Sequence, residues 1–301
     1  MCLFRCIRVP SLASGKQTII WIHWKLLMAS IHNLLQTGFN QLQHLETPSL
    51  DVEVILSHIL KKPREYILTH GEDEVSPEQE KQFNDLIAER AEHKPIAYLT
   101  RHKEFYGRDF YVDERVHIPR PSTEDLIDFI KKTVPLDFSG TMADIGTGSG
   151  CIAITLALKF PQAKIIAADI SPDALAVAKQ NAANLNAKID FYNGDLLAAL
   201  PHSVDIVVSN PPYGWNNEWT KDKEVFFQPT ISHQSGTEGL DDIKKIIKSL
   251  PDYLNPGGQA FIEFDPRQNE QIKKMAAESG FSCEIIKDLA GFDRIAHLWY
   301  K

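Results

Sequence analysis

The sequence predicts an α/β protein in which a small helical domain precedes a doubly wound parallel sheet with helices on both faces. Apolar residues recur at helical spacing from Ile31 to about Lys94, whereas strand-like and helix-like segments alternate from Pro121 to the end of the 301-residue chain. In addition, a glycine-rich turn at residues 144–150 joins a short apolar strand to a helical segment. This order is typical of sheets that bind a nucleotide-like cofactor.

The helical domain is expected to cover residues 28–100. Within it, Asp51–Leu60 carries apolar side chains on one face of a helix, and Ser76–Gln79 has the pattern of a capping box with proline at the first helical position. Residues 101–121 are rich in aromatic side chains around Gly107 and predict a β-hairpin linker. The sheet is then expected within residues 122–301. The first predicted strand starts near residue 141. The other predicted strands cover residues 164–170, 188–193, 204–209, 259–264, 282–287 and 294–301.

The glycine turn is the first candidate site. Its spacing is Gly-x-Gly-x-Gly, which differs from the Gly-x-Gly-x-x-Gly of pyrophosphate binders and lacks the Lys-Ser/Thr ending of a P-loop. The next strand ends in Asp169, which is placed to accept hydrogen bonds from ribose hydroxyls, although it could instead cap the helix that begins near Ser171. This geometry serves both NAD and S-adenosylmethionine. The candidate cofactor-binding residues here are Gly146, Thr147, Gly148, Ser149, Gly150 and Asp169.

The run Asn-Pro-Pro-Tyr at residues 210–213 is the second candidate site. Because proline neither donates to a strand ladder nor rotates freely about φ, two prolines after a buried strand predict a rigid loop at the carboxyl edge of the sheet. The amide side chain, unpaired carbonyl groups and aromatic ring of this loop fit a planar –NH2 group. A methyl group is the obvious group to bring to that nitrogen, so S-adenosylmethionine is favoured over NAD. The candidate catalytic and substrate-binding residues are Asn210, Pro211, Pro212 and Tyr213.

Composition excludes several classes of protein. A net charge of −8 disfavours general nucleic-acid binding, because phosphate contacts need clustered lysine and arginine. No apolar run approaches the ~20 residues of a membrane span. The cysteines have neither metal-ligand spacing nor a disulfide framework, so no metal is predicted and a reducing compartment is expected. These cysteines are Cys2, Cys6, Cys151 and Cys283.

Residues 1–27 are predicted to be an N-terminal extension outside the core. The first acidic residue is Glu46, so this stretch is basic. A mitochondrial targeting segment has this composition but usually contains more arginine and serine, and a secretory signal would have a cleaner apolar core. The favoured interpretation is that translation starts at Met28, which would place the protein in the cytoplasm; a genuine targeting segment would place it in mitochondria.

From about Leu50 to the C-terminus, the motif order resembles the protein-(glutamine-N5) methyltransferases that modify peptide chain release factors. Asn-Pro-Pro-Tyr alone is shared with enzymes that methylate amino groups of DNA bases, whereas a Pro-Arg-Pro linker followed by the glycine loop is more specific. The stretches that carry the resemblance are Lys94–Leu99, Glu104–Gly107, Ile118–Pro121, Asp144–Gly150, Asn210–Tyr213 and Asp288–Arg294. Departures from the family pattern occur at Ser122, Leu196, Gln228 and Glu263–Pro266.

This resemblance implies a class I S-adenosylmethionine-dependent methyltransferase fold whose helical domain, residues 28–100, recognises the substrate. The substrate would be the glutamine of a Gly-Gly-Gln tripeptide in a release factor, held at Asn210 beside the cofactor's methyl group. Asp195 and Leu196 would lie near the adenine, although Asp195 could be a plain turn residue. Arg120 would contact the substrate or form a salt bridge in the linker. The chain's own Gly257-Gly258-Gln259 is expected to be a turn.

Three alternatives stay open. A related enzyme would methylate a glutamine of a ribosomal protein, and another class would methylate amino groups of DNA or RNA bases flipped onto Tyr213. A third possibility is a binding module that has kept the fold and lost the chemistry. We expect a monomer that holds no stable nucleic acid and no membrane.

Overall fold

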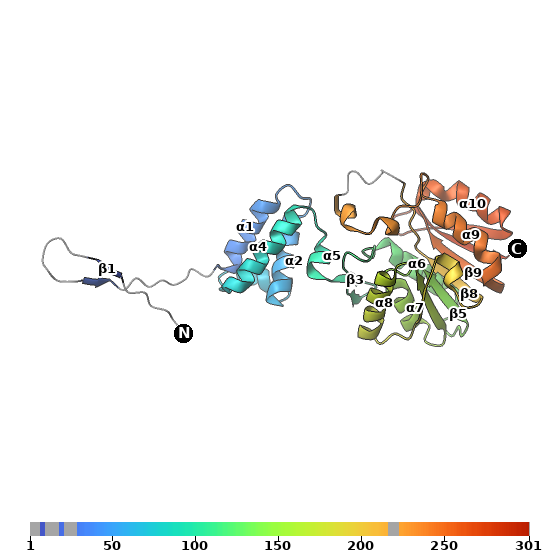
Figure 1. The fold of residues 1–301 in the computed structure, drawn as a ribbon, viewed down its shortest axis with the longest axis horizontal. Coiled ribbons are helices and arrows are strands. Elements are labelled where there is room, and N and C mark those ends of the chain that lie inside the picture. Colours follow the sequence, from blue (N-terminus) through green and yellow to red (C-terminus); the bar gives the residue numbers. More distant parts are fainter. Residues whose placement is uncertain (1–6, 10–17, 21–28, 216–222, 301) are drawn as a thin grey trace. The chain divides into compact units, whose positions relative to one another are not determined.

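The computed structural model describes residues 7–9, 18–20, 29–215 and 223–300 (Figure 1). The chain divides into two compact units, Met1–Ile96 and Ala97–Lys301. Most of the predicted extension, and with it the expected start at Met28, lies outside the described residues. Its described parts are strands β1 (Ile7–Val9) and β2 (Thr18–Ile20), which pair antiparallel.

The first unit is helical. The predicted capping box at Ser76 is confirmed: Gln79 N donates to Ser76 Oγ at 3.3 Å, and Ser76 N donates to Gln79 Oε1 at 3.2 Å. Arg90 and Asp51 form a buried ion pair at 2.7 Å between two of the helices. The helices are α1 (Ile31–Leu42), α2 (Pro48–Leu60), α3 (Arg64–Thr69) and α4 (Pro77–Ala91). Their core contains Leu42, Val52, Ile55, Leu56, Phe83 and Ile87.

The second unit begins with a short hairpin. Helix α5 (Ile96–Thr100) lies at the boundary, and strands β3 (Lys103–Phe105) and β4 (Arg108–Phe110) pair antiparallel after it. The two turn residues, Tyr106 and Gly107, have φ of 53° and 71°, which is the left-handed conformation that a tight type I′ turn requires. The hairpin that the aromatic residues around Gly107 predict is therefore present.

A seven-stranded sheet forms the core of this unit, in the order β10-β11-β9-β8-β5-β6-β7. The five strands from β9 to β7 are parallel, but β11 is antiparallel to both β9 and β10. The predicted doubly wound sheet is therefore confirmed, but the prediction that it is parallel does not hold at this edge. The connection from β10 to β11 is too short for a crossover, so the two strands must form a hairpin. The strands are β5 (Thr141–Ile145), β6 (Lys164–Asp169), β7 (Asp190–Asn193), β8 (Val204–Ser209), β9 (Leu254–Glu263), β10 (Phe281–Lys287) and β11 (Asp293–Tyr300).

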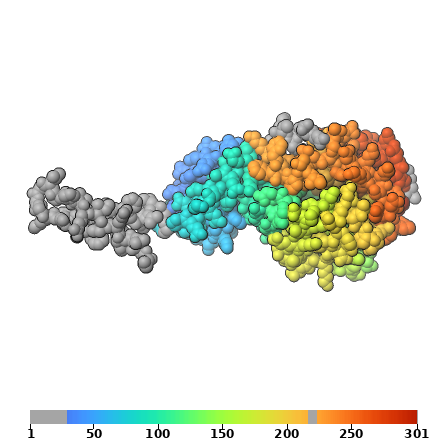
Figure 2. Space-filling model, viewed as in Figure 1, coloured from blue at the N-terminus to red at the C-terminus, as the bar shows by residue number. Residues whose placement is uncertain are grey.

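Helices cover both faces of the sheet (Figure 1). Successive residues of the central strands point to opposite faces: Met142 packs with α6 and α7, whereas Ala143 packs with α9 and α10. On the visible face, the yellow part of the chain packs directly against the orange and red part that carries α9 and α10 (Figure 2). The helices are α6 (Ser122–Thr133), α7 (Cys151–Lys159), α8 (Pro172–Asn184), α9 (Asp241–Tyr253) and α10 (Asn269–Glu278).

The expectation of a plain turn at Gly257-Gly258-Gln259 was wrong, because these residues belong to β9. Between Val204 and Ile206 of β8, the paired strand advances from Leu254 to Gln259, so β9 carries extra residues as a bulge. Gly257 has φ of 80°, which suits such a bulge. Within the described ranges, no helix is long and apolar enough to cross a membrane, and no cluster of side chains could hold a metal ion.

Candidate active site

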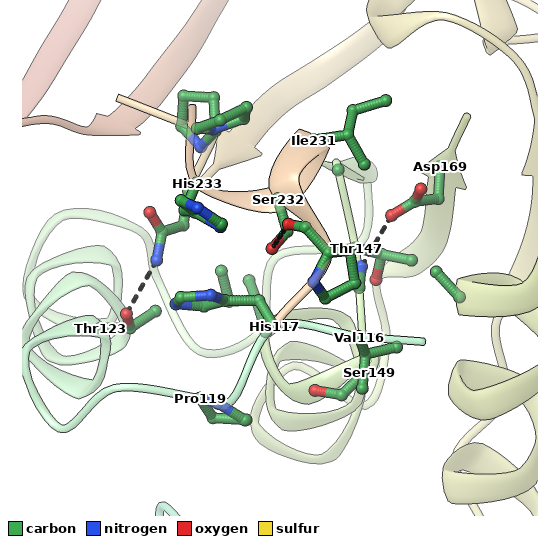
Figure 3. A pocket seen from close by; sticks show the side chains of 18 of the residues that line it. Val116, His117, Pro119, Thr123, Thr147, Ser149, Asp169, Ile231, Ser232 and His233 are labelled. Atoms are coloured by element: carbon green, nitrogen blue, oxygen red, sulfur yellow. Dashed lines mark hydrogen bonds between the residues drawn. The ribbon is translucent and has the colours of Figure 1, made fainter. Parts of the chain in front are cut away.

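A cavity of about 700 Å³ opens at the carboxyl ends of β5, β6 and β8, within the second unit (Figure 3). In a parallel sheet this edge is where loops from neighbouring strands converge. The structure brings together there nearly all the residues that the sequence singled out. Its wall contains Arg120, Gly146, Thr147, Gly148, Ser149, Asp169, Asp195, Leu196, Asn210, Pro211, Pro212 and Tyr213.

The glycine loop is shaped by three left-handed residues. Gly146, Gly148 and Gly150 have φ of 75°, 54° and 82°. Backbone N–H groups of Gly146 and Thr147 both donate to the Ala168 carbonyl, at 2.8 and 3.0 Å, so the loop is fixed to β6. Gly150 is not part of the cavity wall; it precedes α7, where a Cβ would come within 3.1 Å of Ala178. The loop residues from Gly146 to Ser149 line the cavity, and the side chains of Thr147 and Ser149 are part of its wall (Figure 3).

Asp169 also faces the cavity (Figure 3). Its carboxylate accepts hydrogen bonds from the backbone N–H groups of Gly148 and Ser171, both at 2.9 Å. Burial raises the pKa of Asp169 above its ordinary value, and these hydrogen bonds oppose the rise. The side-chain cap of α8 is Ser171, whose hydroxyl accepts from Ala174 N at 3.1 Å. Asp169 thus keeps accepting capacity for a ligand hydroxyl, and its contact with ribose stays a prediction.

Asp195 and Leu196 lie in the same wall, beyond the end of β7. Leu196 has φ of 48°, an uncommon left-handed conformation for a branched side chain. The Asp195 carbonyl accepts from Ala198 N at 3.1 Å, so this residue also begins a 3-10 turn over Leu196–Ala199. Asp195 is therefore both a turn residue and a part of the cavity wall, and the contact of Asp195 and Leu196 with adenine stays a prediction.

Asn210 follows β8 directly. The strand end is anchored by Ser209, whose hydroxyl donates to the Ile145 carbonyl at 2.7 Å. Asn210 Nδ2 donates to Thr123 Oγ1 at 3.0 Å; this is the dashed line at Thr123 in Figure 3. The next aromatic residue, Tyr213, donates its hydroxyl proton to Glu263 Oε1 at 3.3 Å. Both polar side chains of the Asn-Pro-Pro-Tyr loop are consequently held by residues distant in the sequence.

Two buried carboxyl groups were not predicted as site residues. Asp144 Oδ2 accepts from Thr147 Oγ1 at 2.6 Å and from Ala153 N at 3.1 Å, which supports the glycine loop from behind. Glu263 lies at the end of β9 under Tyr213. Burial raises the pKa of each of these groups to about 7. The signal in the sequence was an acid in an otherwise apolar strand, which is costly unless the acid has partners.

Two histidines that the sequence did not single out, His117 and His233, line the cavity and lie near each other (Figure 3). Burial, together with the charges of Arg120 and His233, lowers the pKa of His117 to about 3, so its imidazole is neutral. His117 Nδ1 is buried and has no hydrogen-bond partner among the described residues. Arg120 forms no ion pair within the described ranges, so the predicted linker salt bridge is not formed there.

Comparison with known proteins agrees with this geometry. Two family models match: the PrmC N-terminal domain over residues 33–100 and the methyltransferase small domain over residues 121–230. A release factor glutamine methyltransferase of Koribacter versatilis (strain Ellin345) is 36% identical over 271 residues, covering 87% of this chain and 96% of its own length. A protein of that name from Neisseria gonorrhoeae (strain ATCC 700825 / FA 1090) is 36% identical over 253 residues, covering 82% of this chain and 92% of its own length.

The solved structures to which this chain is similar include a methyltransferase from Pyrococcus furiosus. It covers 75% of this chain and 99% of its own, with a TM-score of 0.49 and 21% identity. A ribosomal protein L11 methylase from Lactobacillus delbrueckii subsp. bulgaricus covers 63% of this chain and 83% of its own, with a TM-score of 0.47 and 24% identity.

Proposed function

Since this chain belongs to the release factor glutamine methyltransferase family, we propose that it transfers the methyl group of S-adenosylmethionine to the side-chain amide nitrogen (N5) of a release factor glutamine. The glutamine would be that of the Gly-Gly-Gln tripeptide. The fold of this chain is that of class I S-adenosylmethionine-dependent methyltransferases. A helical region at the N-terminal side is followed in the sequence by a mainly parallel seven-stranded sheet.

One observation carries this proposal: the glycine loop and Asn210 line one cavity at the same sheet edge. The cofactor that donates the methyl group and the side chain that binds the substrate amide must line the same cavity, because the methyl carbon and the amide nitrogen must come into contact. The cavity of about 700 Å³ lies within the size range of cofactor sites.

The residues present fit S-adenosylmethionine. The loop Gly146–Ser149 would hold its methionine part against backbone, and the Asp169 carboxylate would accept from the ribose hydroxyls. Asp195 and Leu196 would lie along the adenine. When bound, S-adenosylmethionine supplies an electrophilic methyl carbon on a positively charged sulfur.

The chain's own residues would prepare the amide. An amide nitrogen is a weak nucleophile because its lone pair is delocalised into the carbonyl group. Asn210 Oδ1 and the Pro211 main-chain oxygen would accept its two hydrogens, and Tyr213 would pack against its plane. These acceptors stabilise the positive charge that grows on the nitrogen, so no strong base is needed before transfer.

Several finer features belong to this proposal. The helical domain at residues 28–100 would recognise the release factor, residues 101–121 would link the domains, and Arg120 would contact the substrate. We place the enzyme in the cytoplasm; a genuine targeting segment in residues 1–27 would place it in mitochondria instead. It would act as a monomer without stable nucleic-acid or membrane partners.

The decisive test is mass spectrometry of a release factor incubated with this protein and S-adenosylmethionine. We expect one added methyl group on the Gly-Gly-Gln glutamine. A release factor whose glutamine is replaced by alanine serves as the control and should stay unmodified. Methylation of a ribosomal protein or of nucleic acid, with the release factor unchanged, would contradict the proposal.

A further inference from the structure

The amide of Asn210 has a partner on another element. Asn210 Nδ2 donates to Thr123 Oγ1 at 3.0 Å, and the two residues are 87 positions apart in the chain. Thr123 is buried, with 2% of its surface exposed, in the first turn of α6. The side-chain amide of asparagine can rotate by half a turn, which exchanges the positions of its oxygen and its nitrogen. A hydrogen-bond partner on one side therefore determines which of the two atoms faces the cavity.

The direction of this hydrogen bond fixes the orientation of the amide. The Thr123 oxygen accepts from Asn210 Nδ2, so the NH2 end of the amide is held at α6 and Oδ1 is left at the other end. Glu263 is fully buried near the same position, and Thr123 is one of the groups that lower its pKa against the effect of burial.

We propose that Thr123 is a positioning residue that holds the Asn210 amide with Oδ1 turned toward the target amide. This inference rests on the proposed function. In the inverted orientation, Asn210 Oδ1 would face the Thr123 oxygen, and an NH2 group would face the NH2 group of the substrate. The second contact joins two donors, so the inverted amide is unfavourable toward the substrate.

The activity test uses two substitutions at one position. Thr123→Val keeps the volume and shape of the side chain but removes the hydroxyl, whereas Thr123→Ser keeps the hydroxyl. The partly buried NH2 end of Asn210 would lose its acceptor in Thr123→Val, so kcat/KM for the release factor should fall roughly tenfold or more. Thr123→Ser should stay within about threefold of wild type, because the hydroxyl is retained. The affinity for S-adenosylmethionine, measured by calorimetry, should change in neither.

The matched control is Thr155→Val. Thr155 is also fully buried, and its hydroxyl bonds the Cys151 carbonyl at 2.7 Å within α7, outside the cavity wall. It should keep the wild-type kcat/KM. Wild-type kcat/KM in Thr123→Val would overturn the inference. An equal loss in Thr123→Ser would also overturn it, because the hydroxyl would then not be the group that matters.

A second readout does not depend on the substrate. The side-chain NH2 signal of Asn210 in NMR spectra can be assigned by its disappearance in Asn210→Ala. Its hydrogen exchange should be slow in wild type and Thr123→Ser, and roughly tenfold faster in Thr123→Val. Equal exchange in all three would refute the positioning role. A wild-type protein that leaves the release factor unmethylated would refute the proposed function instead, and the exchange rates would still decide the role of Thr123.

Discussion

Replacing Asn210 by alanine should abolish most turnover while leaving cofactor binding nearly intact. The change removes Oδ1, the acceptor proposed for the target amide, together with the hydrogen bond to Thr123. Loss of one preorganised group of this kind costs roughly 2.7–4 kcal/mol in the transition state, which corresponds to about 10²–10³ in rate. The hydrogen bonds that fix the glycine loop run to Ala168 and do not involve Asn210, so the affinity for S-adenosylmethionine should hold.

Single-turnover methylation of the release factor is the suitable assay, because it reports the transfer step without product release. Asn255→Ala is the matched control. Asn255 Nδ2 donates to Asp205 Oδ1 at 2.7 Å, near the amino-terminal ends of β8 and β9 and away from the cavity. The methylation rate of Asn255→Ala should therefore be that of wild type. Asn210→Asp keeps an acceptor but brings a charge, so we expect partial activity. A near wild-type rate in Asn210→Ala would refute the amide-holding role of the loop.

Three further changes test other parts of the structure. Asp169→Ala should weaken S-adenosylmethionine binding at least about tenfold, because two hydroxyl bonds to a carboxylate each contribute on the order of 1.5–3 kcal/mol; unchanged affinity in calorimetry would remove Asp169 from the site. A chain that starts at Met28 should keep its melting temperature and activity, and a loss of several degrees would show that the extension stabilises the fold. Burial raises the pKa of Glu263 to about 7. Between the ordinary pKa of a glutamate and pH 7, the folded state therefore keeps a proton on Glu263 that the unfolded state has released. The stability of the fold consequently falls as the pH rises through this range. Glu263→Gln cannot ionise, so its melting temperature relative to wild type should rise between pH 5 and pH 8, and a constant difference would contradict the ionisation.

The parts of the site that could be predicted from the sequence are those set by local backbone restriction. The predicted turn after β5 is present, with Gly146 and Gly148 in the left-handed conformation that glycine tolerates, and the two prolines after Asn210 follow the end of β8 as expected. The capping box at Ser76 is of the same kind, because all of its atoms lie within one helical turn.

The unpredicted parts depend on contacts between distant segments. Thr123 meets Asn210 across 87 positions, and Tyr213 meets Glu263 across 50. The spacing of these residues in the sequence does not predict that they form hydrogen bonds with one another. The direction of β11 was also missed, since alternating apolar residues predict a strand but not the sense in which it runs. The short connection after β10 contained that information.

The position of β11 has a consequence for the order in which the protein folds during its synthesis. This strand follows β10 in the sequence, yet it lies between β9 and β10. Domains fold as the chain leaves the ribosome, N-terminal parts first. Until Asp293–Tyr300 has emerged, β9 has an unpaired edge and β10 has no neighbour in the sheet. An unpaired edge strand recruits other chains. A chain whose synthesis stops before Asp293 would therefore be prone to aggregate.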